Sequence, residues 1–252
     1  MLKEHLYSKK LGADPHFRWR GGEMSRIEAI SDAVFAITIT LLIVSSASSD
    51  RFFDIWKMVR DLPAFFVSFI LIIYAWFEHY RFFRRYGLED GWTVILNALF
   101  LFLIMILAYP LKFLTTFLWY AIIGENTASL FSIPANAIGD FSVILQRKYM
   151  MYFYSLSIFS VFAVLALMHW HAYKKRALLE LDKVEVFFTR VTLTHHMITL
   201  IIITLSLIVL YTTGNPGVSG IVYFLMPLIH FPVGWFESRK INALITPSQE
   251  KS

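Results

Sequence analysis

The residues best placed to act on an ion lie on one face of an apolar stretch near the N-terminus. Between Arg26 and Ser46 the sequence reads RIEAISDAVFAITITLLIVSS. In a helix that turns about 100° per residue, one face carries Ile30, Ala33, Ile37, Thr40, Leu41 and Val44. An isoleucine ring can close a pore by dewetting, and a hydroxyl ring can replace part of a cation's water shell. The same spacing is also typical of ordinary helix packing.

Ionisable residues occur at the start of this stretch and near a second apolar run. Asp32 lies one to two turns into the expected helix and points about 140° away from Ile37. An ionisable group in a membrane is costly unless it is paired, so we expect Asp32 to bond to a neighbouring helix. His79 lies at a similar depth, with Trp76 one turn before it. We therefore hypothesise a charge-assisted hydrogen bond between Asp32 and His79.

Arg26 falls on the same side of the expected helix as the isoleucine and threonine face. A bare ring of arginines at the mouth of a pore would repel cations, so Arg26 needs a carboxylate partner. Asp32 or Glu28, of the same or a neighbouring subunit, would serve. Side chains on one straight helix meet at spacings of three or four, so Arg26 and Asp32 of one helix are not natural neighbours.

The composition of the chain is that of an integral membrane protein. Of its 252 residues, 57% are apolar and 16% are charged, against about 25% charged in an average soluble domain. Apolar runs of about 20 residues are long enough to cross about 30 Å of hydrocarbon. Cysteine is absent, which excludes disulfides, thiolate zinc sites and cysteine nucleophiles. The net charge of +5 is read as a membrane-orientation signal, with no nucleic-acid partner expected.

These runs predict an all-α fold of six transmembrane helices. We expect a cytosolic N-terminal arm (1–24), a six-span domain (25–240) and a cytosolic tail (241–252). Ser25 and Glu28 have the spacing of a capping box at the first helix. The expected spans are about 26–46, 63–83, 92–112, 149–171, 187–213 and 218–236.

Two segments between the spans have alternative interpretations, and charge sets the orientation. Residues 113–147 are either an outside loop with an interfacial piece or part of a longer, kinked third helix. The carboxylates of Glu180, Asp182 and Glu185 are expected to form a solvated face of the inner linker. Lys and Arg are concentrated in the segments that lie inside if the N-terminus is inside, which predicts cytoplasmic termini.

The residues from Arg26 to Asp32 carry a resemblance to a known family. They resemble the first-helix signature Arg-x-x-x-Phe-Ser-Asp of the transmembrane-protein-175 potassium channel family, with Ile30 in place of the family's Phe. The apolar and threonine run that follows agrees, as do Trp76 and His79 near the inner end of the second span and the number of spans.

The resemblance implies a prokaryotic single-repeat member that forms a homotetramer in the cell membrane, around a central pore lined by the first helix. It implies conduction of K⁺ in preference to Na⁺, without a TVGYG-type filter and without a cofactor. The family's pore positions correspond here to Ile37, Thr40 and Val44, and Leu41 shares their face. The residues implied to hold the helices in register are Arg26, Ser31, Asp32, Trp76 and His79. The implied partners are further copies of the chain, the lipid bilayer and monovalent cations.

Two alternatives from other functional classes remain open. A secondary transporter would need a midplane site made by broken helices, for which Pro227 and Pro232 give some support. A membrane haem protein would place histidines on facing helices. The candidate histidines, which interfacial or helix–helix hydrogen bonding also explains, are His169, His171, His195 and His196. His230, between the two prolines, either marks a broken helix that lines a cavity or is buried against a neighbouring helix. Enzymatic motifs such as a Gly-rich phosphate loop, a nucleophile elbow or HExxH are absent, so no enzyme is expected.

Overall fold

A computed structural model describes residues 17–22, 24–44, 51–131 and 142–249 of the chain. Every regular element in these ranges is helical. In chain order the elements are α2 (Arg26–Val44), α3 (Phe52–Arg60), α4 (Leu62–Tyr86), α5 (Gly91–Ile122), the 3₁₀ turn η1 (Thr127–Phe131), α6 (Val143–Lys174), α7 (Lys183–Thr213), α8 (Pro216–Val222) and α9 (Leu225–Gln249). Within the described residues, six stretches are long and apolar enough to cross a membrane, the last formed by α8 with the first part of α9. The all-helical, six-span expectation is therefore confirmed.

Several of the helices begin at polar residues that cap them. At the start of α2, Glu28 N donates to Ser25 Oγ at 3.1 Å and Ser25 N donates to Glu28 Oε2 at 2.9 Å. Asp182 and Glu185 form a second capping box at the start of α7. These reciprocal bonds satisfy backbone N–H groups that have no partner inside the helix. The capping box expected at the first helix is therefore present.

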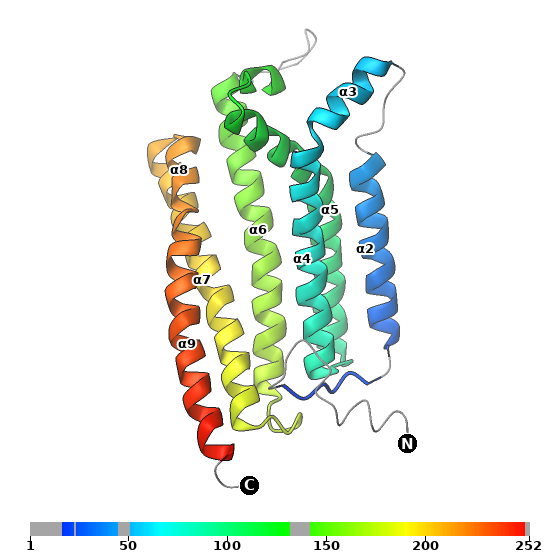
Figure 1. Cartoon of the computed structure of the whole chain (residues 1–252), viewed down its shortest axis with the longest axis vertical. Coiled ribbons are helices and arrows are strands. Elements are labelled where there is room, and N and C mark those ends of the chain that lie inside the picture. Colours follow the sequence, from blue (N-terminus) through cyan, green and yellow to red (C-terminus); the bar gives the residue numbers. More distant parts are fainter. Residues whose placement is uncertain (1–16, 23, 45–50, 132–141, 250–252) are drawn as a thin grey trace.

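The helices stand side by side, with α2 at one edge and α9 at the other (Figure 1). The most extensive packing joins α6 to α7, α4 to α5, α2 to α5 and α5 to α6. The start of α2, the ends of α4 and α6 and the start of α7 lie at one end of the bundle (Figure 1). We call this the strap end, after the strap formed by residues 17–22, which crosses it.

The third helix is longer than the expected span of 92–112. Helix α5 continues through Pro110 to Ile122, so the apolar residues 115–122 belong to it, as the longer-helix alternative required. A proline inside a membrane helix is tolerated where a neighbouring group satisfies the disturbed backbone. Here the hydroxyl of Tyr154 on α6 donates to the carbonyl of Pro110.

Other bounds also differ from the expected ones. Helix α6 begins at Val143, about six residues before the expected start, because Ser142 caps it by accepting from Leu145 N. Between the first two spans the chain forms the short helix α3. Helix α9 continues past residue 236 to Gln249, into the expected tail. The end of the first span at Ser46 and the last residues of the tail, 250–252, lie outside the described residues.

Candidate functional site

Helix α2 has one face packed against its own subunit and one face turned away from it. The packed face carries Glu28, Ser31, Phe35, Thr38 and Leu42, and its main partners are α5 and α4. The exposed face carries Ile30, Ile37, Thr40, Leu41 and Val44. The candidate pore residues therefore lie together on the exposed side, as their helical spacing predicted.

The two threonines of this helix are alike in local bonding and opposite in environment. Thr40 Oγ1 donates to Ala36 O at 2.8 Å, and Thr38 Oγ1 donates to Val34 O at 2.8 Å. Thr38 is fully buried, whereas Thr40 is exposed. Because its proton is committed to the helix backbone, the Thr40 oxygen presents only lone pairs outward. It can therefore accept from water or approach a cation.

Asp32 bonds to Trp76, and the expected Asp32–His79 bond does not form. The indole Nε1 of Trp76 on α4 donates to Asp32 Oδ1 at 2.8 Å. His79 is 1% exposed and its ring lies among Phe35, Phe83 and Phe100, while Asp32 is on the exposed side of α2. The rotation of α4 thus directs Trp76, one turn earlier, to the carboxylate.

His79 instead belongs to a buried chain of hydrogen bonds that joins three helices. His79 Nε2 lies 2.7 Å from Asn97 Oδ1, and Asn97 Nδ2 donates to Ser31 Oγ at 2.9 Å. Ser31 in turn donates to Ile27 O at 2.7 Å. Since the amide oxygen of Asn97 can only accept, His79 carries its proton on Nε2. Asn97, on α5, is a site residue that sequence reasoning missed; a lone amide in an apolar span was the available signal.

Arg26 is exposed, and within the described part of the chain it forms no ion pair. Glu28, one of its two expected partners, pairs instead with Arg84 at the end of α4, at 2.9 Å. Arg84 Nη1 also donates to Gly21 O of the strap at 3.0 Å. The start of α2 is therefore fastened to α4 and to the strap through the carboxylate of Glu28.

The strap also reaches the start of α7, where it contacts a buried carboxylate. Glu185 is fully buried, and its Oε2 lies 2.6 Å from Arg20 Nη2. Its Oε1 accepts from Arg18 N at 2.8 Å. The expectation that Glu185 belongs to a solvated face is therefore wrong, because two strap arginines cover it. The same expectation agrees with the structure for Glu180 and Asp182, whose side chains are exposed.

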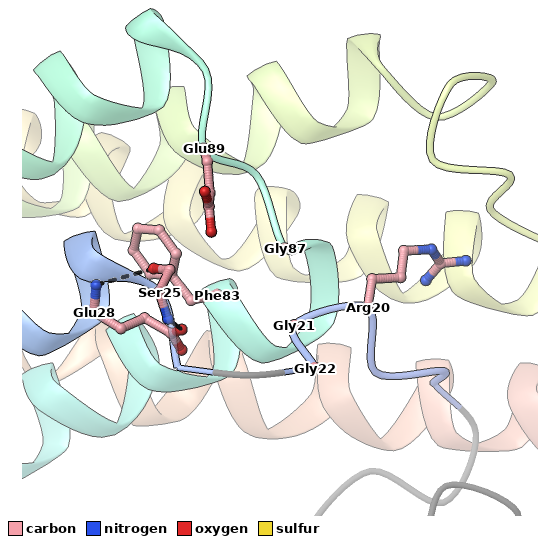
Figure 2. Close-up of a pocket in the computed structure, with 8 residues that line it drawn as sticks. All are labelled: Arg20, Gly21, Gly22, Ser25, Glu28, Phe83, Gly87 and Glu89. Carbon is pink, nitrogen blue, oxygen red and sulfur yellow. Dashed lines mark hydrogen bonds between the residues drawn. The ribbon is translucent and has the colours of Figure 1, made fainter. Parts of the chain in front are cut away.

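A polar pocket of about 260 Å³ lies between the strap, the first turn of α2 and the turn from α4 to α5. Figure 2 shows Glu28 and Glu89 beside this space, with the side chain of Arg20 directed away from it. Three of the residues that line it are glycines, namely Gly21, Gly22 and Gly87. The pocket therefore lies where the strap meets the start of α2.

Asp90 ties the turn between α4 and α5 to the end of α6. It caps α5 by accepting from Thr93 N at 2.9 Å, and it pairs with His171, at 2.8 Å, and with Lys175. Burial alone would raise the pKa of Asp90, but the bonds from Lys175, His171 and Thr93 outweigh burial and hold that pKa well below its usual value.

Four other histidines of the described ranges, His169, His195, His196 and His230, lie between helices. His195 Nδ1 lies 2.7 Å from His230 Nδ1, and His195 Nε2 lies 2.9 Å from Glu237 Oε2. The rings of His169 and His196 are 5.0 Å apart, and both are buried. In the described ranges, clusters of three or more side chains suited to hold a metal ion are absent. The contacts are helix–helix hydrogen bonds and ring packing.

Six candidate membrane spans, an exposed apolar and threonine face on the first of them and a buried polar chain behind that face are the features of a multi-span membrane protein. Residues 26–110 match the family described as the endosomal/lysosomal potassium channel TMEM175. A potassium channel of Marivirga tractuosa is 36% identical over 249 residues, which cover 95% of this chain and 98% of that one. The chain therefore belongs to the TMEM175 family.

Two further comparisons agree. A potassium channel of Streptomyces collinus is 30% identical over 122 residues, covering 46% of this chain and 59% of that one. The crystal structure of a single-residue variant of the potassium channel MtTMEM175, in complex with a nanobody–MBP fusion protein, matches with a TM-score of 0.75 and 37% identity. That match covers 91% of this chain and 100% of the other. All three of these relatives are named as potassium channels.

Proposed function

We propose that this chain forms a homotetrameric, potassium-selective leak channel whose central pore is lined by α2. The observation that carries the proposal is the division of α2 into an anchored face and an exposed face. One subunit supplies one such helix, and a single helix cannot enclose a pore. Several copies around an axis are therefore required, and the family's relatives, named as potassium channels, support K⁺ as the permeant ion.

In this proposal Ile37 forms the narrow hydrophobic constriction. Its side chain is 55% exposed in the single subunit, and that of Val44, two turns further along, is 60% exposed. A ring of branched aliphatic side chains holds no water when it is narrow, so it opposes the flow of hydrated ions. Val44 then forms the outer apolar ring, and Leu41 flanks the pathway between them.

Thr40 would supply the polar ring between these apolar rings. Its hydroxyl proton is bound to Ala36 O, so four copies would direct oxygen lone pairs toward the axis. Oxygen atoms of this kind can replace some of the water around a K⁺ ion. Selectivity would then depend on how easily the ion loses part of its hydration shell, which is easier for K⁺ than for Na⁺.

The polar contacts between α2 and the rest of its own subunit would hold the four copies of α2 at the same position along the pore axis. They would also fix the rotation of each copy about its own helix axis. Ser31, Asp32, Trp76 and His79 act in this way through the bonds described above. Arg26 would lie at the inner mouth, and an exposed carboxylate such as Asp32 of a neighbouring subunit would neutralise it. Without that neighbour, a ring of arginines would repel the permeant cation.

We also propose that the strap end faces the cytoplasm of a cell whose plasma membrane holds the channel. Basic residues gather at this end, among them Arg18, Arg20, Arg81, Arg84, Arg85, Lys174, Lys175, Arg176 and Lys183. Fewer lie at the opposite end, namely Arg51, Lys57, Arg60, Lys112, Arg147 and Lys148. Loops rich in Lys and Arg stay inside, so the positive-inside rule supports this orientation.

The test is K⁺ flux through the purified protein in liposomes, with a matched pair of isoleucine variants. Ile37 and Ile43 are 55% and 51% exposed on the same helix, but they lie about 120° apart around its axis. If Ile37 lines the pore, Ile37→Asn will wet the constriction and raise flux, whereas Ile43→Asn will leave flux near the wild-type level. Equal effects, or no K⁺ flux through the wild-type protein, would contradict the proposal. Flux that saturates and depends on a counter-substrate would indicate a transporter.

A further inference from the structure

We infer that Glu185, on α7, positions the pore helix α2 by clamping the strap, an inference that rests on the proposed role of α2. Helices α2 and α7 lie well apart in the bundle, and the strap crosses between their inner ends (Figure 1). Glu185 would thus be a positioning residue that acts on the pore through the segment just before it.

The first step of the clamp is the capture of the strap by a buried carboxylate. Besides its 2.6 Å contact with Arg20, Glu185 accepts from Arg20 Nη1 at 3.1 Å and from the backbone N–H of Arg18 at 2.8 Å. It also caps α7 by accepting from Asp182 N at 3.0 Å. A fully buried carboxylate is tolerated only with such partners, so the strap stays in place as long as Glu185 is charged.

The second step transmits this position to α2. Arg20 N and Gly21 N donate to the carbonyl of Arg84 at 3.0 and 3.2 Å. The side chain of Arg84 donates back to Gly21 O and pairs with Glu28, which caps the first turn of α2. An unbroken series of contacts therefore runs from α7 through the strap and α4 to the start of the pore helix.

The strap lies in close contact with the end of α4. A Cβ atom on Gly21 would lie 2.7 Å from the carbonyl oxygen of Phe83, closer than real Cβ atoms come to other atoms. Gly87, at the end of α4, has a φ of +56°, and a Cβ there would lie 3.0 Å from Arg20 C. Glycine at both positions permits the close approach. A tightly seated strap can fix a helix, whereas a loose one could not.

The absence of cysteine in the chain provides a direct readout of the clamp. Met24, which is 63% exposed, lies between the strap and α2 and can carry a spin label on a single introduced cysteine. We expect Glu185→Gln to increase the mobility of this label and to lower K⁺ flux in liposomes several-fold, because released helices can rotate and turn Thr40 away from the axis. Glutamine keeps an oxygen for the cap on Asp182 N but loses the charge that holds the arginines.

Three further variants separate positioning from simple loss of structure. Glu180→Gln removes a charge from the neighbouring turn, where the side chain is exposed, and it should change neither readout. Glu185→Asp keeps the charge and should restore part of the flux and of the label's immobilisation. Arg20→Gln breaks the same contact from the strap side, so it decides the question if Glu185→Gln does not fold.

The inference is overturned if the label is as immobile in Glu185→Gln as in the wild type. It is also overturned if the label is freed and the flux stays at the wild-type level. A wild-type protein that conducts no K⁺ would instead contradict the pore assignment of α2. The label mobility would still decide whether Glu185 holds the strap.

Discussion

The indole N–H of Trp76 on α4 donates to the carboxylate of Asp32 on α2 at 2.8 Å. This bond is the outermost of the polar contacts that hold α2, since Asp32 is exposed in the single subunit. It joins the helix that carries the candidate pore face to its neighbour by a charge-assisted bond. Removing the Trp76–Asp32 hydrogen bond should therefore weaken the packing of α2 without creating a cavity in the core.

Trp76→Phe keeps an aromatic ring but removes the donor. We expect this change to lower the stability by about 1 kcal/mol, the usual contribution of one hydrogen bond in a partly exposed position. Asp32→Asn keeps an acceptor and should cost less. Thermal unfolding in detergent, followed by tryptophan fluorescence, measures both. Trp92→Phe, at a 65% exposed position on α5, is the control, and an equal loss there would contradict a specific role for the Trp76 bond.

Asn97→Leu should be more damaging, because the amide connects two buried groups. The change leaves the Nε2–H of His79 and the hydroxyl of Ser31 without this partner, at a cost of about 2–3 kcal/mol. Thr204→Val, on the exposed side of α7, should change stability by less than about 0.5 kcal/mol. Denaturation midpoints of the three proteins test this, and an Asn97→Leu protein as stable as the wild type would rule the chain out as a stabilising element.

Thr40→Ala and Thr38→Ala form a matched pair that separates permeation from packing. Thr40→Ala should change the ratio of K⁺ to Na⁺ flux by removing an outward oxygen, with little effect on stability. Thr38→Ala should leave this ratio unchanged and lower stability by about 1 kcal/mol, because Thr38 is buried. Ion-substitution flux assays and thermal unfolding provide the two readouts. A change of ion ratio in the Thr38 variant alone would reverse the assignment.

Asp90→Asn should reveal a pH-dependent contribution to stability. The pKa of Asp90 is lowered in the folded protein, so its ion pairs stabilise fully above the unfolded value of about 3.9. That stabilisation is lost as the pH falls below about 4 toward the folded pKa. The difference in melting temperature between wild type and variant should therefore be full at pH 5 and shrink toward pH 3. A difference that grows on acidification would contradict a stabilising role for the ionised Asp90 carboxylate.

The spans and the exposed face of α2 could be predicted because each depends on local pattern alone. Long uncharged runs have few alternatives to a membrane helix, and the face of Ile37, Thr40 and Val44 follows from helical period. The end of α5 could not be predicted in this way. A proline commonly kinks or ends a helix, and only the hydroxyl of Tyr154, 44 residues from Pro110 in the chain, shows how α5 continues through it.

The pairing of polar groups across helices could not be predicted from the sequence, for a related reason. Asp32 and His79 have similar depths, but the rotation of α4 about its axis decides which side chain meets α2, and no periodicity records this rotation. The third helix then supplies Asn97 to the histidine. Glu185 looked like part of a solvated linker because its partners, Arg18 and Arg20, lie more than 160 residues earlier.

That separation also imposes an order on biosynthesis. Arg20 leaves the ribosome 165 residues ahead of Glu185. At about 5–20 residues per second, translation alone delays their meeting by roughly 10–30 s. Until α7 has been made, the start of α2 in a nascent chain lacks the contacts that Glu185 supplies through the strap. Chains that stall early would therefore lack these contacts, and such unfinished subunits would be poorly shaped to join the proposed tetramer.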